Sequence, residues 1–302
     1  MEIVFAQASD KGISRQENQD AMGTFSGPWG RLFVVCDGLG GHAGGAIASR
    51  VAVQRIGAAF AEAIASALPA AALEAALVSG NQAVRAAAQK SGLVEMATTC
   101  VALFIPTDLQ HAYAAHAGDS RIYRIRGQEI AQITRDHTEY QRRLDAGESV
   151  PERGPGTELL HLVERSLGPS PELDVSVSEP LPLREGDVYL LCSDGLTTML
   201  DDEDIRRYVG ELPPSSAVVE LVGLANARGG YDNITVQVVE IASALHRDAP
   251  SESGLVRISD LLAEHQDFRA RQQRIRKRQR LFVTAVVVVC VWILLACVWA
   301  AV

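Results

Sequence analysis

Five aspartates lie where apolar, strand-like runs of the sequence meet turns. Asp37 follows "LFVVC", Asp119 follows "AYAAHAG" and Asp194 follows "VYLLCS". Asp20 closes "RQENQD", and Asp232 directly precedes "NITVQVV". A single aspartate in such a place is ordinarily a turn former, but five in the same setting suggest a shared role. Because oxygen ligands without histidine or cysteine favour Mg²⁺ or Mn²⁺ over zinc, the pattern predicts a site for these ions.

The glycine-rich stretch "DGLGGHAGG" at 37–45 allows two interpretations. The glycines could cradle a dinucleotide, or they could let the backbone approach a metal ion held by Asp37. A dinucleotide fold requires a second parallel strand that ends in an acid about 20 residues beyond the last glycine. Residues 46–90 instead show helical spacing of apolar residues throughout. The metal interpretation is therefore favoured.

The composition favours helices that cover sheets, because alanine is abundant and aromatic residues make up only 5% of the chain. We expect helices within 46–90, broken near Pro69, and at 138–147, 201–210 and 215–228. Strands are expected at 31–36, 187–195 and 233–241. Four short runs, 100–105, 111–118, 121–127 and 129–134, suggest an antiparallel meander. Residues 147–182 are rich in glycine and proline and are expected to be irregular.

The segment 281–302, "LFVTAVVVVCVWILLACVWAAV", contains no charged residue. At about 1.5 Å per residue, a helix of this length crosses a bilayer core of about 30 Å. A buried core helix is the alternative, but soluble helices of this length show a polar face. The preceding residues carry one acid, Asp267, and a run of cations: Arg269, Arg271, Arg274, Arg276, Lys277, Arg278 and Arg280.

Positive charge beside a membrane span marks the cytoplasmic side. We therefore expect a transmembrane helix at 281–302, a linker and basic juxtamembrane segment at 243–280, and a single-pass protein of the inner membrane with its main domain in the cytoplasm.

Charge and cysteine content argue against a nucleic-acid-binding protein and against a zinc-knuckle or redox motif. A net charge of −9 disfavours nucleic acid as a partner. Cys36, Cys100 and Cys192 lie in apolar runs, and Cys290 and Cys297 lie in 281–302. Since no pair has the spacing of a zinc knuckle or a redox motif, we expect all five to act as small apolar residues in a reducing compartment.

Several blocks of the sequence occur in the order found in one enzyme family. They are "RQENQD" (15–20), "VVCDGLGGHAGGAIAS" (34–49), "ATTCVALFI" (97–105), "AHAGDSRIYRIR" (115–126), "ITRDHTEYQRRLDAG" (133–147), "VERSLG" (163–168), "DVYLLCSDGLTTML" (187–200) and "DNITVQVV" (232–239). Together they resemble the bacterial metal-dependent serine/threonine protein phosphatases of type 2C. The resemblance covers residues 1–242 and implies an α+β fold, a four-layer α-β-β-α sandwich of two antiparallel sheets flanked by helices.

The resemblance also implies roles for individual residues. Asp37 would bridge two Mn²⁺ or Mg²⁺ ions, with the Gly38 carbonyl on one ion and Asp194 and Asp232 on the other. Asp20 would assist Asp37 and the Gly38 carbonyl. Two cations that share a bridging carboxylate lower the pKa of a shared water and clamp phosphate oxygens, so no enzyme nucleophile is needed.

Two more residues receive roles in this way. Asp119 would hold a third, weaker ion that bacterial members often bind. Arg15 would bind the substrate phosphate, a role that suits the planar guanidinium group.

The sequence departs from the family pattern at two positions. Gln19 stands where many members have glutamate, and Leu39 stands where eukaryotic members have a histidine general acid, as an apolar residue does in bacterial relatives. The identity of a general acid therefore stays open. His42, His116 and His137 are each interpreted first as structural residues. The segment 147–168 corresponds to the family's variable flap, or else to an inert surface loop.

We expect a membrane-anchored protein serine/threonine phosphatase, monomeric, that acts on phosphoproteins produced by a cognate kinase. One alternative is a catalytically weak pseudophosphatase that binds phosphoproteins and regulates a membrane complex, but the presence of all five aspartates argues against it. A metal-assisted nuclease is also disfavoured, because the acidic domain would repel a polyanion. The sequence does not specify the substrates.

Overall fold

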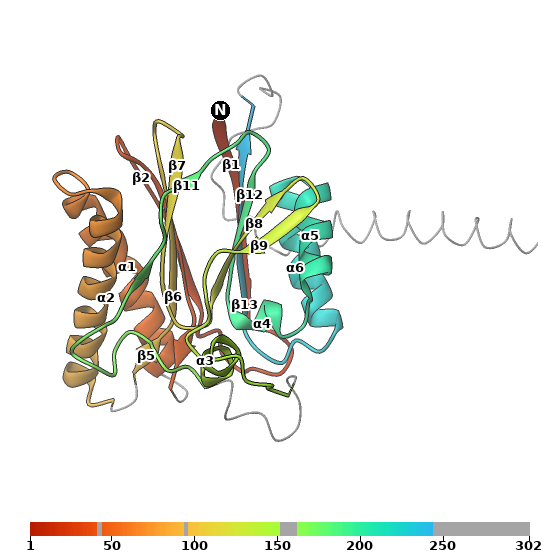
Figure 1. The fold of residues 1–302 in the computed structure, drawn as a ribbon. Helices are drawn as coiled ribbons and strands as arrows, with labels where there is room; N and C mark the ends of the chain where they lie inside the picture. Colours follow the sequence, from red (N-terminus) through yellow and green to blue (C-terminus); the bar gives the residue numbers. More distant parts are fainter. Residues whose placement is uncertain (41–43, 94–95, 152–161, 244–302) are drawn as a thin grey trace, which may run out of the picture. The chain divides into compact units, whose positions relative to one another are not determined.

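The computed structural model describes residues 1–40, 44–93, 96–151 and 162–243. Two antiparallel β-sheets pack face to face at its centre, and helices cover their outer faces (Figure 1). The predicted arrangement of two antiparallel sheets flanked by helices is confirmed.

The first sheet has the strand order β1-β13-β12-β8-β9. Its members are β1 (Glu2–Asp10), β13 (Ile234–Ala242), β12 (Val188–Cys192), β8 (Arg121–Arg126) and β9 (Glu129–Gln132). Helices α5 (Asp202–Glu211) and α6 (Pro214–Ala227) lie on the outer face of this sheet (Figure 1). The short helix α4 (Asp194–Thr197) begins directly after β12, at one end of the sheet.

The second sheet has the order β10-β7-β6-β3-β2, and β11 pairs with β7 beside this path. Its members are β10 (Ser176–Val177), β7 (His111–Ala117), β6 (Cys100–Pro106), β3 (Gly30–Cys36), β2 (Ala21–Gly27) and β11 (Leu181–Pro182). The long helices α1 (Gly44–Ala63) and α2 (Pro69–Ser91) cover its outer face (Figure 1). A small two-stranded sheet joins β4 (Gly38–Leu39) to β5 (Ala97–Thr98), and α3 (Glu139–Asp145) follows β9.

Strand β3 shows how the sequence builds both halves of the core. Its side chains alternate, because successive residues of a strand point to opposite faces. Leu32 and Val34 pack with α1 and α2 in one apolar cluster. Phe33 and Val35 pack with residues of the first sheet in a second cluster between the sheets. A continuous apolar run therefore marks a strand that is buried on both faces.

The predicted meander is wrong at its centre. Strands β6 and β7 pair with each other, and so do β8 and β9, but the two hairpins belong to different sheets. The chain crosses between the sheets over residues 118–120, where Gly118 has φ 118°. A Cβ at this glycine would lie 2.6 Å from Cβ of Thr99. The tight crossing therefore needs glycine, and it places Asp119 at the end of both sheets.

Helices lie close to their predicted positions, with α1 and α2 separated near Pro69 as expected. Cys36, Cys100 and Cys192 are buried and free, as predicted. Among the described residues, no helix is long and apolar enough to cross a membrane. The predicted transmembrane helix at 281–302 and the basic segment before it lie outside the described residues.

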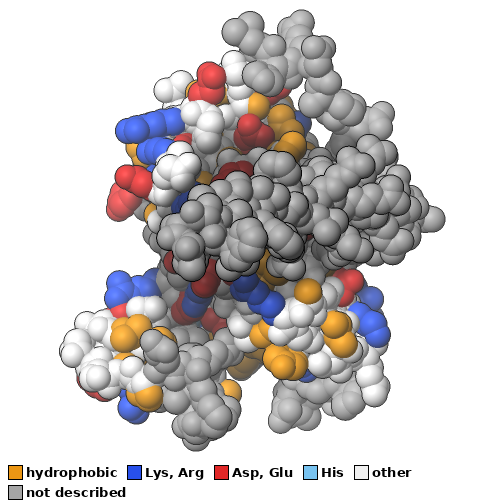
Figure 2. All heavy atoms as spheres, turned by 90° about the vertical axis from the view of Figure 1, so that its right-hand side faces the viewer, with side chains coloured by type: hydrophobic (Ala, Val, Ile, Leu, Met, Phe, Trp, Pro, Cys, Tyr) orange, Lys and Arg blue, Asp and Glu red, His pale blue; other side chains and the backbone are white. Residues whose placement is uncertain are grey.

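Figure 2 shows acidic and basic side chains interspersed on the face that carries α5 and α6. Two ion pairs lie on or beside α5: Arg206 with Glu203, and Asp204 with Arg228, which directly follows α6.

Candidate active site

The five aspartates meet at one end of the two sheets because the strands that carry them are antiparallel. Asp37 follows the last residue of β3, and Asp20 precedes the first residue of β2, which pairs with it at Ala21↔Cys36. Asp194 follows β12, and Asp232 precedes β13, its antiparallel neighbour. Asp119 lies at the crossing after β7. The prediction that these carboxylates lie at strand ends is confirmed.

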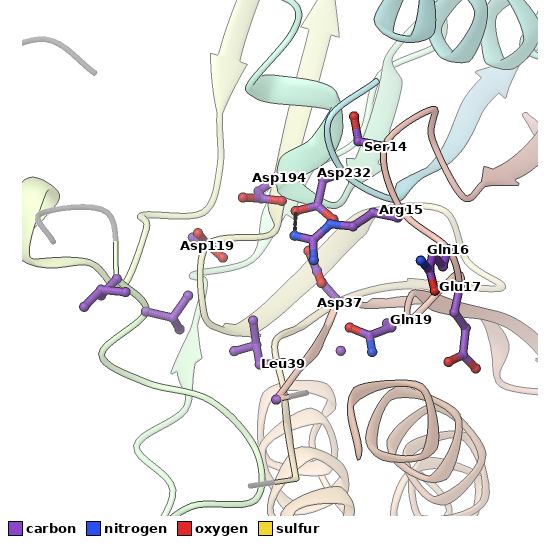
Figure 3. A pocket seen from close by; sticks show the side chains of 14 residues that line it. Ser14, Arg15, Gln16, Glu17, Gln19, Asp37, Leu39, Asp119, Asp194 and Asp232 are labelled. Atoms are coloured by element: carbon purple, nitrogen blue, oxygen red, sulfur yellow. Dashed lines mark hydrogen bonds and ion pairs between the residues drawn. The ribbon is translucent and has the colours of Figure 1, made fainter. Parts of the chain in front are cut away.

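Four of these carboxylates line one pocket of about 840 Å³ together with Arg15. Asp37, Asp119, Asp194 and Asp232 point toward one another across it (Figure 3). Asp20 is buried below the pocket, where its Oδ2 accepts a hydrogen bond of 2.7 Å from Ser193 Oγ. Its other carboxylate oxygen has no hydrogen-bond partner among the described residues.

The backbone of Asp37 is fixed by two threonines, Thr98 at the end of β5 and Thr99 between β5 and β6. Thr99 N donates to Asp37 O at 2.8 Å, and Thr98 Oγ1 donates to the same oxygen at 2.8 Å. Asp37 N in turn donates to Thr99 Oγ1 at 3.1 Å. These hydrogen bonds hold the Asp37 backbone in place and so limit the directions in which its carboxylate can point.

Gly38 is enclosed by backbone on two sides. A Cβ at this position would lie 2.3 Å from Gly45 O and 2.5 Å from Gln19 O. A Cβ at Gly45 would in turn lie 2.7 Å from the Gly38 carbonyl oxygen. Glycine at both positions lets the start of α1 approach the predicted carbonyl ligand closely.

Asn233 ties together the segments that present Asp194, Asp232 and Arg15. Its Oδ1 accepts from Gln19 N at 2.8 Å, and its Nδ2 donates to the carbonyls of Lys11 and Glu17 at 2.9 Å. A Cβ at Gly195 would lie only 2.0 Å from Asn233 O, so α4 packs directly against this segment. The sequence pattern indicated no role for Asn233 in the site, although the block "DNITVQVV" contains this residue.

Two histidines support the crossing that carries Asp119. Their rings stack with centroids 4.5 Å apart. Gly118 N donates to His137 Nδ1 at 3.1 Å, so the proton of His137 is on Nε2, which donates to Ser176 Oγ at 3.0 Å. Burial lowers the pKa of His116, and burial with the neighbouring His116 lowers that of His137 to about 4. Both are neutral structural residues, as expected, whereas His42 lies outside the described residues.

The carboxylates raise one another's pKa. Burial, followed by Asp20 and Asp194, raises the pKa of Asp37 well above its usual value. Burial is also the first cause for Asp20, whose pKa is about 6, and for Asp119, whose pKa is about 7. Such a cluster is stable in its ionised form only with additional positive charge, and Arg15 is the one cation among the described lining residues.

We expect the metal-free protein to lose stability as the pH rises from about 6.5 to 8. Asp119 has a folded-state pKa of about 7, above the value near 3.8 of the unfolded chain, and the pKa of Asp37 is also raised. The lowered pKa values of His116 and His137 oppose this effect only below about 6.5, where a histidine of the unfolded chain is protonated. Above that pH the folded state binds more protons, and the free energy of unfolding falls as they are released. Thermal unfolding in EDTA should show a midpoint that falls by several degrees. Asp119→Asn should flatten the slope, and a midpoint that rises over this range would contradict the assignment.

The residues fit divalent ions that keep part of their water shell. Among the described residues, no three acidic, histidine or cysteine side chains form a ready-made cage for one ion. Mg²⁺ and Mn²⁺ keep several waters and need few protein ligands each. The converging carboxylates, the buried oxygen of Asp20 without a hydrogen bond and the glycine-lined approach to the Gly38 carbonyl match that requirement.

Comparison with known proteins agrees with this geometry. Residues 12–227 match the family model described as protein phosphatase 2C. The chain belongs to the protein phosphatase 2C family. It is therefore a metal-dependent protein serine/threonine phosphatase and acts on phosphorylated proteins. The chain is 35% identical to the protein phosphatase PhpP of Streptococcus pneumoniae over 237 residues, which cover 77% of this chain and 95% of PhpP.

Solved structures of protein phosphatase 2C members share the fold. The catalytic domain of the serine/threonine phosphatase PstP in complex with two manganese ions is 33% identical, with a TM-score of 0.67, covering 80% of this chain and 99% of that chain. PppA of Pseudomonas aeruginosa is 35% identical, with a TM-score of 0.66, covering 79% of this chain and 99% of PppA. The two manganese ions of the PstP structure support a requirement for divalent metal in this family.

Most residues predicted for the site lie together. Arg15, Asp37, Gly38, Asp119, Asp194 and Asp232 line the pocket, and Asp20 lies beneath it. Gln19 and Leu39 line it as well. The flap predicted at 147–168 is described only in part, and Leu162 and Val163 from it reach the pocket.

Proposed function

We propose that the enzyme is a membrane-anchored phosphatase that faces the cytoplasm and hydrolyses phosphoserine and phosphothreonine in proteins. The observation that carries the catalytic part is the convergence of Asp37, Asp119, Asp194 and Asp232 in one open pocket beside Arg15. Two Mn²⁺ or Mg²⁺ ions bound there would polarise phosphate oxygens and lower the pKa of a water between them.

Different side chains would bind the metal ions and support the residues that bind them. Asp37, the Gly38 carbonyl, Asp194 and Asp232 would hold the two ions, with Asp37 shared by both. Asp20 supports this set from below and holds Ser193, which precedes Asp194. Asp119 stands at the crossing, where it would hold a third ion.

Arg15 supplies the cation that orients the substrate. Its side chain is half exposed and donates to Asp232 at 2.7 Å, so one edge of the guanidinium group stays accessible from the pocket. The hydrogen bond to Asp232, together with the nearby charges of Asp37 and Asp194, raises the pKa of Arg15. The guanidinium group therefore stays charged. A charged planar donor at the pocket rim suits a phosphate dianion.

The test is phosphate release from a phosphothreonine peptide by the fragment 1–242. We expect activity with Mn²⁺ or Mg²⁺ and none in excess EDTA, because every proposed ligand is an oxygen. Readdition of Mn²⁺ should restore the rate. Full activity in EDTA would contradict the two-metal mechanism, and binding of the phosphopeptide without turnover in Mn²⁺ would favour the pseudophosphatase.

The membrane anchor is the sequence-based part of this proposal. It is supported by the uncharged segment 281–302 and by the cations from Arg269 to Arg280 before it. Anchoring would raise the effective concentration of the enzyme toward membrane-bound phosphoproteins without any new contact.

Deletion of 281–302 is expected to move the protein from the membrane fraction to the soluble fraction. The truncated enzyme should keep its rate on a small phosphopeptide and act more weakly on its natural membrane-associated target. Fractionation and protease protection measure both points. A truncated protein that stays with the membrane, or a main domain digested by protease outside intact cells, would refute the topology.

A further inference from the structure

We propose that a second pocket next to the active site binds an acidic side chain of the substrate protein, a few residues from the phosphorylated one. The proposal rests on the function proposed above and adds a sequence preference to it. The second pocket has a volume of about 380 Å³ and is lined by Leu39, Gly40, Arg85, Ala88, Gln89, Met96, Ala97, Gly168 and Pro169.

The second pocket adjoins the catalytic one. Leu39 and Gly40 line both, so they form the ridge between the two. A substrate whose phosphate lies at the aspartates would extend across this ridge. An extended peptide advances about 3.3 Å per residue, so the residues next to the phosphorylated one are those that would lie over the second pocket.

The wall of the second pocket opposite the ridge is held rigidly. Asn81, fully buried on α2, accepts from Gly168 N at 2.7 Å and donates to Ser170 O at 2.9 Å. Gly168 has φ 115°, and a Cβ there would lie 2.3 Å from Met96 O. Leu167 and Thr98 exchange hydrogen bonds of 2.8 and 3.0 Å between their backbones. A site that is already formed costs little ordering when it binds.

Arg85 gives the second pocket its charge. Its Nη1 donates to the carbonyls of Gly168 and Pro169 at 3.3 and 3.0 Å, which fixes a half-buried side chain against the wall. Among the described residues, no carboxylate forms an ion pair with it. A positioned guanidinium group whose described partners are neutral carbonyls can bind an anion strongly.

The remaining lining determines what kind of anion fits. Leu39, Ala88, Met96 and Pro169 are apolar, and Gln89 adds one neutral polar group. A glutamate has an aliphatic stem for such walls and a carboxylate for Arg85, whereas a lysine would bring a second cation beside the arginine. The carboxylates of the catalytic pocket have the opposite sign, so Arg85 would direct an acidic residue to its own side of the ridge.

The test uses the full-length chain in Mn²⁺ and phosphothreonine peptides that differ by Glu, Gln or Lys at one position, scanned over three residues on each side. At one position, Glu should exceed Lys in kcat/KM by roughly three- to tenfold, as for a partly exposed ion pair. Arg85→Glu should invert this preference. The rate on p-nitrophenyl phosphate, which is too small to reach the second pocket, should not change.

Gln89→Glu provides a variant that leaves the wall contacts of Arg85 in place. It adds one negative charge at an exposed position of the lining, and it should reduce the Glu preference. Gln54→Glu is the matched control, because it makes the same change at an exposed position of α1, outside the pocket lining and away from the helix turns that carry Arg85, and it should have no effect.

The outcomes separate this proposal from the proposed function. Hydrolysis of p-nitrophenyl phosphate without discrimination between Glu and Lys at any position would overturn the second site and leave the phosphatase assignment intact. Loss of both activities in the unaltered enzyme would overturn both. If Arg85→Glu also lost activity on p-nitrophenyl phosphate, a reduced Glu preference in Gln89→Glu but not in Gln54→Glu would support the site, and an unchanged preference in Gln89→Glu would overturn it.

Discussion

Asp37→Asn is expected to lower phosphatase activity by about a thousandfold or more. The substitution keeps the size and shape of the side chain but removes the charge that both ions would share. Stabilisation of transition-state charge by a metal site is worth several kcal/mol, and each 1.4 kcal/mol corresponds to about tenfold in rate. Steady-state kinetics on a phosphothreonine peptide in saturating Mn²⁺ would measure the change. Asp194→Asn is expected to act in the same direction.

The same variant should be at least as stable as the unaltered protein when metal is absent. Burial and the neighbouring aspartates raise the pKa of Asp37, so its ionised form is disfavoured in the folded state at neutral pH. A neutral amide removes that cost. We therefore expect an equal or higher thermal midpoint in EDTA.

Asp187→Asn serves as the matched control. Asp187 is fully buried, and it accepts hydrogen bonds from Arg126 at 2.6 and 2.7 Å and from Arg184 N at 2.8 Å. Its substitution should lower the thermal midpoint and leave turnover by the folded enzyme unchanged. If Asp37→Asn kept more than about a tenth of the activity, or lost stability as Asp187→Asn does, the bridging role would be wrong.

The positions of the catalytic carboxylates could be predicted from local sequence. Each aspartate interrupts or borders an apolar run, and apolar runs mark strands, so Asp37, Asp194 and Asp232 were placed at strand ends without any tertiary information. Their convergence required the family resemblance, because a run of residues does not specify which strand becomes its neighbour. The pairing of β12 with β13 and of β2 with β3 supplies that information.

The elements that were missed depend on contacts between distant parts of the chain. Strand β1 pairs along its whole length with β13, more than two hundred residues away, and nothing in the opening segment indicates that partner. The crossing at Gly118 was predicted as a turn of one meander for the same reason. Asn233 has the appearance of a turn residue in the sequence, yet its amide bonds three backbone groups of the segment that carries Arg15.

The predicted role of Arg15, binding of the substrate phosphate, comes from the family resemblance. The structure adds a second partner for Arg15, the carboxylate of Asp232. Its Nη2 donates to Asp232 Oδ2 at 2.7 Å, while Asp232 Oδ1 accepts from Asn233 N at 2.8 Å. Arg15 could thus act on the substrate phosphate directly, or it could only orient a metal-binding carboxylate. The two roles differ in what their loss would change.

Arg15→Ala is expected to raise KM for the phosphothreonine peptide by about tenfold or more, because it removes a charge-assisted hydrogen bond to the phosphate. The concentration of Mn²⁺ that gives half-maximal activity should not rise, since removal of a cation makes the carboxylate cluster a better site for metal ions. Arg15→Lys should recover part of the loss, because a lysine restores the charge without the planar pair of donors.

Three measurements separate the possible roles of Arg15. A higher KM with unchanged Mn²⁺ dependence would support phosphate binding. A weaker Mn²⁺ response together with a lower kcat would show instead that Arg15 acts through Asp232. An unchanged KM with a lower thermal midpoint would assign the ion pair a purely structural role, although a half-exposed pair of this kind contributes about 1 kcal/mol or less to stability. Because that contribution is small, a tenfold change in KM at an unchanged thermal midpoint is the result that we expect.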